Sequence, residues 1–203
     1  MREVRDMMDL INESNRQAAG RIRQLLEQTG TQLVCAESCT AGLVSATLAQ
    51  WPGISGWLCG GFVVYQTDIK HEWLGIDPKL LQNPDIGPVS REVTGMLTLR
   101  ALERTPQANV AIAVTGHLGP GAPELLDGVV FVAIAERFHK VADELGVASQ
   151  PGVERMFRLR DHETLSDDTG MTSSKIDVRS SRMARAVSHV LGTLHDFLIQ
   201  KIR

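Results

Sequence analysis

The chain has 203 residues, of which 43% are hydrophobic and 22% are charged, a composition typical of a soluble globular protein long enough to bury a full core. Its formal net charge of -3 excludes the broad basic surface by which proteins bind nucleic acid or an anionic membrane. No apolar run approaches the length of a membrane span, and the N-terminus lacks the basic-then-apolar order of a signal peptide, so we expect a cytoplasmic protein.

The cysteine pattern indicates reduced thiols. Cys35, Cys39 and Cys59 are odd in number, which favours structural thiols over disulfide bridges. No Cys/His spacing resembles a zinc site, and we expect neither a metal nor a cofactor. Cys39 stays open as a nucleophile, because it would stand at a helix N-terminus, where the pKa of a thiol is lowered.

The first half of the chain alternates helices and strands. A helical pattern, as one bent helix or two, covers residues 4–28 and ends at Thr29-Gly30, and we regard about residues 1–20 as an N-terminal extension. A buried strand over 31–36 and a helix from about 39 to 50 follow. After a turn-rich break over 51–56, a second strand covers 57–65, and a short helix capped by Thr67 ends near residue 74.

The second half continues the alternation. A polar loop precedes a helix capped by Ser90, a third buried strand covers 109–114, and a central strand over 128–136 is expected to lie beside another over 152–159. Residues 161–174 are acidic and rich in Ser and Thr, which predicts a mobile insertion, and 176–202 form a long amphipathic helix. We therefore expect one domain over residues 1–203, an α/β/α three-layer sandwich with a mixed, mostly parallel sheet.

Two junctions between strands and the following segments attract attention. Ser38, Cys39 and Thr40 come directly after the first strand, where a helix N-terminus would offer N–H groups to a phosphate or a developing oxyanion. A simple helix cap is the alternative, although one hydroxyl would suffice for it. Residues 115–121, Thr-Gly-His-Leu-Gly-Pro-Gly, follow the third strand and should face the same crevice, unless they form a plain turn. His117 lies there and could be considered as a general base, whereas the other five histidines show no ligand or triad pattern.

Three segments in order resemble the CinA C-terminal domain family: residues 36–42, residues 61–65 with Lys70, and residues 113–116 with 119–121. The resemblance implies a nicotinamide-nucleotide amidase that converts nicotinamide mononucleotide into nicotinate mononucleotide and ammonia. It makes Ser38 the nucleophile and Tyr65 with Lys70 its activators, which requires that burial or a nearby positive dipole lower the pKa of Lys70. It also implies a small-molecule nucleotide partner, a homo-oligomer and a set of substrate-binding residues: Glu37, Cys39, Thr40, Gly42, Thr115, Gly116, Gly119, Gly121 and, as the phosphate ligand near the start of the last helix, Arg179.

The sequence also departs from the family pattern. Ala41 replaces a glycine, Gln66-Thr67 replace Ser-Asn, and residues 122–127 lack the usual Lys-Pro-Val. These changes affect the parts expected to hold substrate, so an amidase for another nucleotide, or a nucleotide-binding module without catalysis, are alternatives. A structural oligomerisation domain is a third interpretation. Within the amidase hypothesis, Ser38 either attacks the substrate itself or positions a water molecule.

Overall fold

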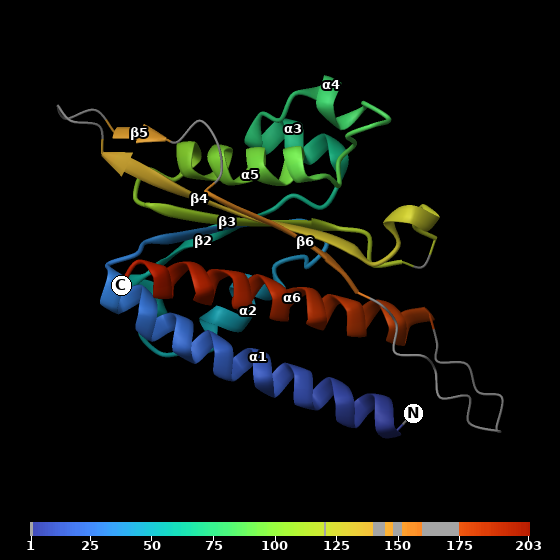
Figure 1. Cartoon of the computed structure of the whole chain (residues 1–203), viewed down its shortest axis with the longest axis horizontal. Helices are drawn as coiled ribbons and strands as arrows, with labels where there is room; N and C mark the ends of the chain where they lie inside the picture. Colours follow the sequence, from blue (N-terminus) through green and yellow to red (C-terminus); the bar gives the residue numbers. More distant parts are fainter. Residues whose placement is uncertain (1, 120, 140–144, 148–151, 160–174) are drawn as a thin grey trace.

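A computed structural model describes residues 2–119, 121–139, 145–147, 152–159 and 175–203. It has an alternating order of helices and strands (Figure 1). In chain order these elements are α1 (Arg2–Thr29), β1 (Leu33–Glu37), α2 (Leu43–Ala49), a 3-10 turn (Ile54–Gly56), β2 (Leu58–Val63), α3 (Thr67–Leu74), α4 (Pro78–Leu81), α5 (Arg91–Arg104), β3 (Val110–Gly116), a second 3-10 turn (Glu124–Leu126), β4 (Val129–His139), β5 (Leu145–Val147), β6 (Val153–Arg158) and α6 (Lys175–Gln200).

The strands form a mixed sheet. β1 pairs in parallel with β2 on one side and with β3 on the other. β4 runs antiparallel to β3, and both β5 and β6 pair antiparallel with β4. Because Glu37 of β1 is in register with Val63 of β2 and Val114 of β3, the carboxyl ends of the three parallel strands meet at one edge of the sheet.

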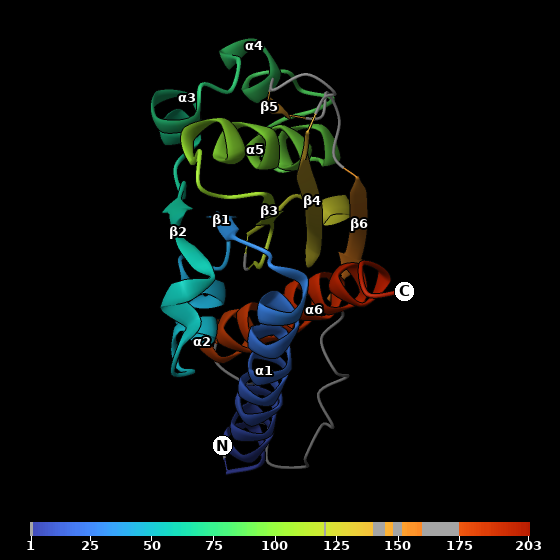
Figure 2. The same cartoon turned by 90° about the vertical axis from the view of Figure 1, so that its left-hand side faces the viewer.

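Helices cover both faces of the sheet. α1, α2 and α6 lie on one face and α3 to α5 on the other (Figures 1 and 2). The alternation of side chains along β3 explains the two cores that result. Ile112 and Val114 pack toward α1, α2 and α6, whereas Ala111 and Ala113 pack toward α3 and α5. The predicted fold class, a three-layer sandwich around a mixed sheet, is confirmed.

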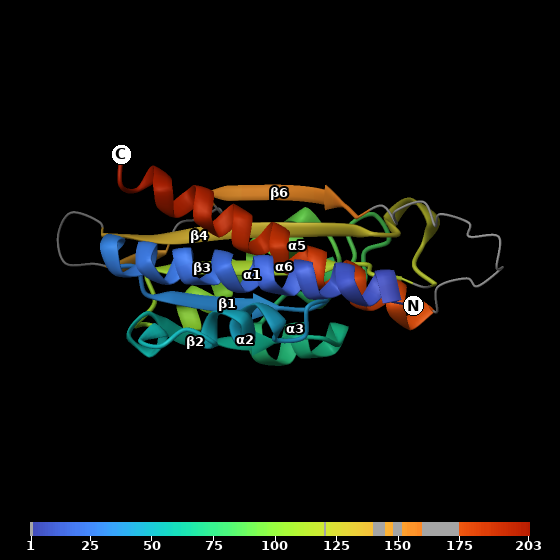
Figure 3. The ribbon, with the colours of Figure 1, turned by 90° about the horizontal axis from the view of Figure 1, so that it is seen from below.

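The first and last helices lie side by side along one face (Figure 3). A buried polar contact joins them, because Asn15 of α1 donates to the carbonyl of Ala184 at 2.9 Å and accepts a hydrogen bond from the Ser188 hydroxyl at 2.7 Å. Within the residues that the structure describes, none of the helices is both long and apolar enough to cross a membrane.

The structure corrects some predicted boundaries. α2 begins at Leu43 rather than near residue 39, since residues 38–42 form a separate turn. Thr67 is the first residue of α3 rather than its cap, which is Gln66. α4, which lies in the predicted polar loop, and β5 were not expected. The predicted insertion over 161–174 lies outside the described residues.

Candidate active site

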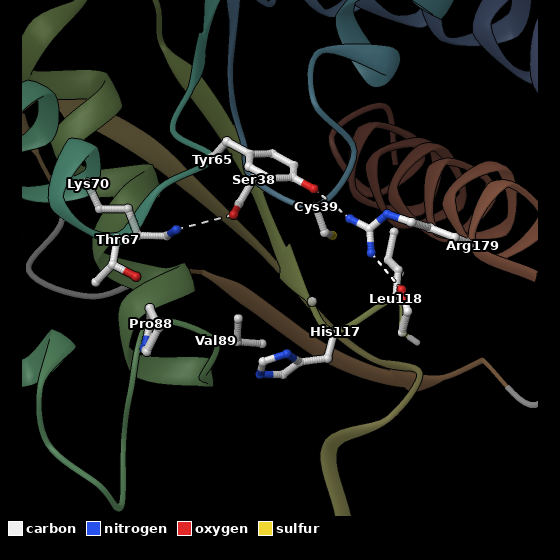
Figure 4. A pocket seen from close by; sticks show the side chains of 12 residues that line it. Ser38, Cys39, Tyr65, Thr67, Lys70, Pro88, Val89, His117, Leu118 and Arg179 are labelled. Atoms are coloured by element: carbon white, nitrogen blue, oxygen red, sulfur yellow. Dashed lines mark hydrogen bonds between the residues drawn. The ribbon is translucent and has the colours of Figure 1, made fainter. Parts of the chain in front are cut away.

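A cleft lies beyond the ends of β1, β2 and β3. β1 is the middle one of these strands, and the chain leaves it over one face of the sheet through α2 but reaches β3 over the other face through α5. Such a reversal opens a crevice at the carboxyl ends of the strands, where α/β proteins bind ligands. The cleft has a volume of about 280 Å³ and is lined by residues that follow the three strands, by Pro88 and Val89, and by Arg179 of α6 (Figure 4).

A buried carboxylate anchors the turn that carries Ser38. Glu37, the last residue of β1, is 1% exposed. Its oxygens accept hydrogen bonds from the Thr40 hydroxyl at 2.8 Å, from the backbone N–H groups of Val44 and Ser45 at 3.0 and 2.8 Å, and from the Ser45 hydroxyl at 2.6 Å. The carboxylate therefore stands at the N-terminus of α2, where the helix dipole stabilises a negative charge.

This anchoring overturns one expectation about the first junction. The N–H groups of the first turn of α2 are not free for a phosphate or an oxyanion, because Glu37 holds those of Val44 and Ser45, and the carbonyls of Thr40 and Gly42 accept from Leu43 and Ala46. The N–H groups of Cys39 and Thr40 differ, since neither donates to a backbone carbonyl in the described part of the chain. These two groups are the candidates for oxyanion donors beside Ser38.

Lys70 contacts the hydroxyl of Ser38 directly. Its Nζ donates to Ser38 Oγ at 3.2 Å and to the carbonyl oxygen of Val64 at 3.0 Å (Figure 4). Lys70 lies on α3 one turn before Leu74, and both side chains are on the buried face of that helix. The helix thus carries the ammonium group inward, under the turn after β1.

The environment of Lys70 changes its acidity. Lys70 is only 2% exposed, and burial lowers its pKa from 10.5 to about 8. At pH 7 about a tenth of the Lys70 side chains are therefore uncharged amines, and this share rises steeply toward pH 8. A serine beside a desolvated lysine is a known arrangement for nucleophilic catalysis.

Cys39 lines the cleft beside Ser38 but is not a thiolate. Burial is the main cause that raises the pKa of its thiol to about 12. The expected lowering at a helix N-terminus does not occur, since the dipole of α2 is already compensated by Glu37 and the sulfur has little contact with water. The Cys39 thiol is therefore protonated near neutral pH, which disfavours it as a nucleophile and leaves Ser38 as the candidate.

Arg179 bridges the two sides of the cleft. Its Nη2 donates to the Tyr65 hydroxyl at 2.5 Å and its Nη1 to the carbonyl oxygen of Gly119 at 2.7 Å (Figure 4). Tyr65 follows β2 and Gly119 follows β3, so one guanidinium joins both loops. The Tyr65 hydroxyl thus contacts Arg179 rather than Ser38, and this end of the cleft carries a positive charge that suits an anionic group.

The predicted substrate-binding residues separate into distinct places. Cys39, Gly116, Gly119 and Arg179 line the cleft, together with Ser38, Tyr65 and Lys70. Glu37, Thr40 and Gly42 build the turn behind Ser38, and Gly121 is exposed. Thr115 does not line the cleft, because its hydroxyl is buried against that of Thr94 on α5 at 2.7 Å.

The sequence does not reveal every residue of the cleft. It indicates Thr67 only as a helix cap and Leu118 only as part of the loop over 115–121, and it gives no reason to select Pro88 or Val89. The only signal for Pro88 and Val89 is their position shortly before α5. His117 also lines the cleft, and burial lowers its pKa, so its imidazole is neutral at pH 7. The described residues contain no cluster of His, Cys, Asp and Glu that would hold a metal ion.

Residues 15–156 match the model of the CinA C-terminal domain family. Among curated relatives, the chain is 44% identical over 90 residues to a CinA-like protein of Mycobacterium marinum and 39% identical over 125 residues to one of Chlorobium phaeovibrioides. The two matches cover 44% and 61% of this chain, but they span only 20% and 28% of those relatives.

Solved structures share the fold. A competence-damaged protein (CinA) superfamily protein of Klebsiella pneumoniae superimposes with a TM-score of 0.70 at 20% identity, over 92% of this chain and 98% of that one. A competence/damage inducible protein of Agrobacterium tumefaciens gives a TM-score of 0.63 at 27% identity, over 88% of this chain and 94% of that one.

Proposed function

Because this chain belongs to the CinA C-terminal domain family, we propose that it is a nicotinamide-nucleotide amidase, which hydrolyses nicotinamide mononucleotide to nicotinate mononucleotide and ammonia. The observation that carries this proposal is the buried contact between Lys70 Nζ and Ser38 Oγ at 3.2 Å. A solvated lysine would not serve, whereas one whose pKa is lowered to about 8 by burial can act as a base.

In the first step, Ser38 Oγ attacks the carboxamide carbon while the neutral Lys70 amine takes the hydroxyl proton. The negative charge that develops on the carboxamide oxygen is stabilised by the N–H groups of Cys39 and Thr40, which have no backbone acceptor among the described residues. When the tetrahedral intermediate collapses, the C–N bond breaks and the Lys70 ammonium returns its proton to the nitrogen, which leaves as ammonia. An ester on Ser38 remains.

In the second step, water attacks the ester and Lys70 accepts one of its protons. That proton then passes to Ser38 Oγ as the C–O bond to the serine breaks, and the acid loses the second proton of the water to solvent and leaves as nicotinate mononucleotide. The alternative in which Ser38 only orients a water molecule uses the same residues. Rapid quenching distinguishes the two, because only the covalent path leaves nicotinate mononucleotide attached as an ester to Ser38.

The other end of the cleft suits the phosphate of the nucleotide. Arg179 presents a guanidinium between Tyr65 and Gly119, and such a fork matches two phosphate oxygens. With the carboxamide at Ser38 and the phosphate at Arg179, the substrate would extend across the cleft from the loop after β1 to α6. Tyr65 then acts on the substrate through Arg179 rather than on Ser38.

The test is ammonia release from nicotinamide mononucleotide by the purified chain, beside the variants Ser38→Ala and Lys70→Met. We expect turnover in the parent and a loss of at least about 10³-fold in each variant, since removal of a nucleophile or its base has effects of this order. Thr67→Ser, which keeps a cleft hydroxyl, is the control and should remain within about threefold of the parent. Nucleotide binding by the parent without ammonia release would contradict the amidase and leave a binding module.

A further inference from the structure

The loop after β3 packs against an ion pair that includes neither Ser38 nor Lys70. Arg182 of α6 is 5% exposed, and its Nη1 and Nη2 donate to Oδ1 and Oδ2 of Asp127 at 2.8 and 2.7 Å. Two parallel bonds of this kind fix the relative orientation of both groups. The hydrogen bonds from Arg182 also lower the pKa of Asp127, so the carboxylate keeps its charge at neutral pH.

Gly119 packs directly against this pair. A Cβ atom at position 119 would lie 2.6 Å from Arg182 Nη1 and 2.8 Å from Asp127 Oδ1. Its φ of 58° also favours glycine. On its other side, the carbonyl oxygen of Gly119 accepts the hydrogen bond from Arg179. The backbone at Gly119 is therefore held between two arginines of the same helix.

The segment before β4 is also held by an arginine of β6. Arg158 of β6 donates to the carbonyl oxygens of Leu125 at 2.8 Å and Asp127 at 3.4 Å. Asp127 is thus tied to the sheet through Arg158 and to α6 through Arg182. Since Arg179 and Arg182 are three residues apart and lie on neighbouring positions of the helix surface, this attachment also sets where Arg179 meets the cleft.

We propose that Asp127 and Arg182 are positioning residues for recognition of the substrate phosphate. They do not touch the substrate; they hold Gly119 and the start of α6 so that Arg179 faces the cleft. The role rests on the proposed function in one respect, namely that Arg179 receives the phosphate of a nucleotide. It goes beyond that function because it concerns affinity for the phosphate and not the chemistry at Ser38.

The experiment compares Asp127→Asn with Asp196→Asn. Asp196 of α6 also accepts from an arginine, Arg155, at 2.9 Å, whereas the atoms that pack nearest to Gly119 belong to Arg182 and Asp127, so Asp196 is the matched control. Calorimetry measures the Kd of nicotinamide mononucleotide and of nicotinamide riboside, which lacks the phosphate. We expect Asp127→Asn to weaken nucleotide binding about tenfold and riboside binding less than twofold, whereas Asp196→Asn changes neither. Arg182→Lys keeps the charge but loses the two parallel hydrogen bonds, so its Kd for the nucleotide should lie between those of Asp127→Asn and the parent. It replaces Asp127→Asn in the comparison if that variant does not fold.

Two results with the variants would overturn the inference. One is equal Kd values for Asp127→Asn and Asp196→Asn, and the other is equal weakening of both ligands by Asp127→Asn, which indicates general damage to the fold. A parent that binds the riboside as tightly as the nucleotide also refutes it, because then Arg179 holds no phosphate. Failure of the amidase proposal is distinct. It would show as a parent that prefers the nucleotide but releases no ammonia, and in that case the positioning role stands.

Discussion

At the scale of single residues, the Tyr65 hydroxyl contacts a different group from the one that the family resemblance implies. Its hydroxyl accepts from Arg179 and not from a group beside Ser38. We therefore expect Tyr65→Phe to raise KM for the nucleotide by about three- to tenfold while kcat falls less than threefold, since one hydrogen bond that orients Arg179 is lost. Steady-state kinetics of ammonia release checks this. If kcat instead fell by about two orders of magnitude while KM stayed unchanged, Tyr65 would be an activator of Ser38.

Ala41, which replaces a glycine of the family pattern, is expected to lower the free energy of unfolding. Its φ is 51°, in the left-handed region that glycine occupies more easily. Its side chain is exposed and does not line the cleft, so the strain lies in the turn and does not crowd the substrate. We expect Ala41→Gly to raise the free energy of unfolding by about 0.5–1 kcal/mol, measured in urea.

Ala46→Gly is the matched control for this prediction. Ala46 is also exposed but lies within α2, where glycine is destabilising by about 1 kcal/mol. The two substitutions should therefore shift stability in opposite directions. The same direction in both would show that the turn at Ala41 is not strained.

The residues of the site differ in how far the sequence reveals them. Ser38 follows a clear strand signal, and a hydroxyl there attracts attention from local pattern alone. The local pattern does not indicate Lys70, because a lysine after a short helix cap is typical of a solvated surface. Only the family resemblance indicates a functional role for this lysine. Its burial depends on how α3 packs under the turn after β1. The pair of Asp127 and Arg182 joins residues 55 positions apart, and no local pattern predicts such a contact.

At the scale of elements, Glu37 joins β1 to α2 and so fixes the turn that carries Ser38. Glu37→Gln keeps the shape but presents an amide NH₂ to donors that now bond a carboxylate. We expect a loss of roughly 2–3 kcal/mol in the free energy of unfolding, together with a lower kcat because Ser38 is displaced.

Denaturant unfolding and ammonia release measure both effects of Glu37→Gln. Glu72→Gln on the exposed face of α3 is the control and should stay within about 0.5 kcal/mol of the parent. If Glu37→Gln is as stable as this control, the carboxylate does not hold the turn.

The elements themselves were largely predictable, and the failures have physical causes. Strands β1 and β3 are buried runs of apolar residues, and α6 has a regular apolar face, so their existence follows from the sequence. α2 begins four residues later than expected, because the carboxylate of Glu37 is at its first turn and residues 38–42 form the turn between them. α4 is a single turn capped by Asp77, which is too short to show a period. β5 is also short and is defined by its pairing with β4.

At the scale of the whole molecule, burial of Lys70 links catalysis to stability. Below about pH 8 the lysine is charged in both the folded and the unfolded chain, so folding bears the full cost of burying the charge. Between about pH 8 and 10.5 the unfolded chain binds more protons, and stability rises with pH. Above that range Lys70 is neutral in both the folded and the unfolded chain, so folding no longer buries a charge.

Lys70→Met removes this dependence. The free energy of unfolding of the parent, relative to Lys70→Met, should therefore rise by roughly 3 kcal/mol between pH 7 and 10.5, as the shift from 10.5 to about 8 implies. Urea titrations of both proteins at several pH values measure the difference. Parallel pH profiles of the two proteins would show that Lys70 has an ordinary pKa in the folded chain.

The most direct test of the Ser38 and Lys70 pair is the pH dependence of kcat/KM for ammonia release from nicotinamide mononucleotide. Only the uncharged amine of Lys70 can take the proton of Ser38, so we expect kcat/KM to rise with pH and level off above about pH 8, where burial has placed the pKa of Lys70. Turnover that does not change between roughly pH 6 and 9, or that survives in Lys70→Met, would contradict a mechanism in which this buried lysine activates Ser38.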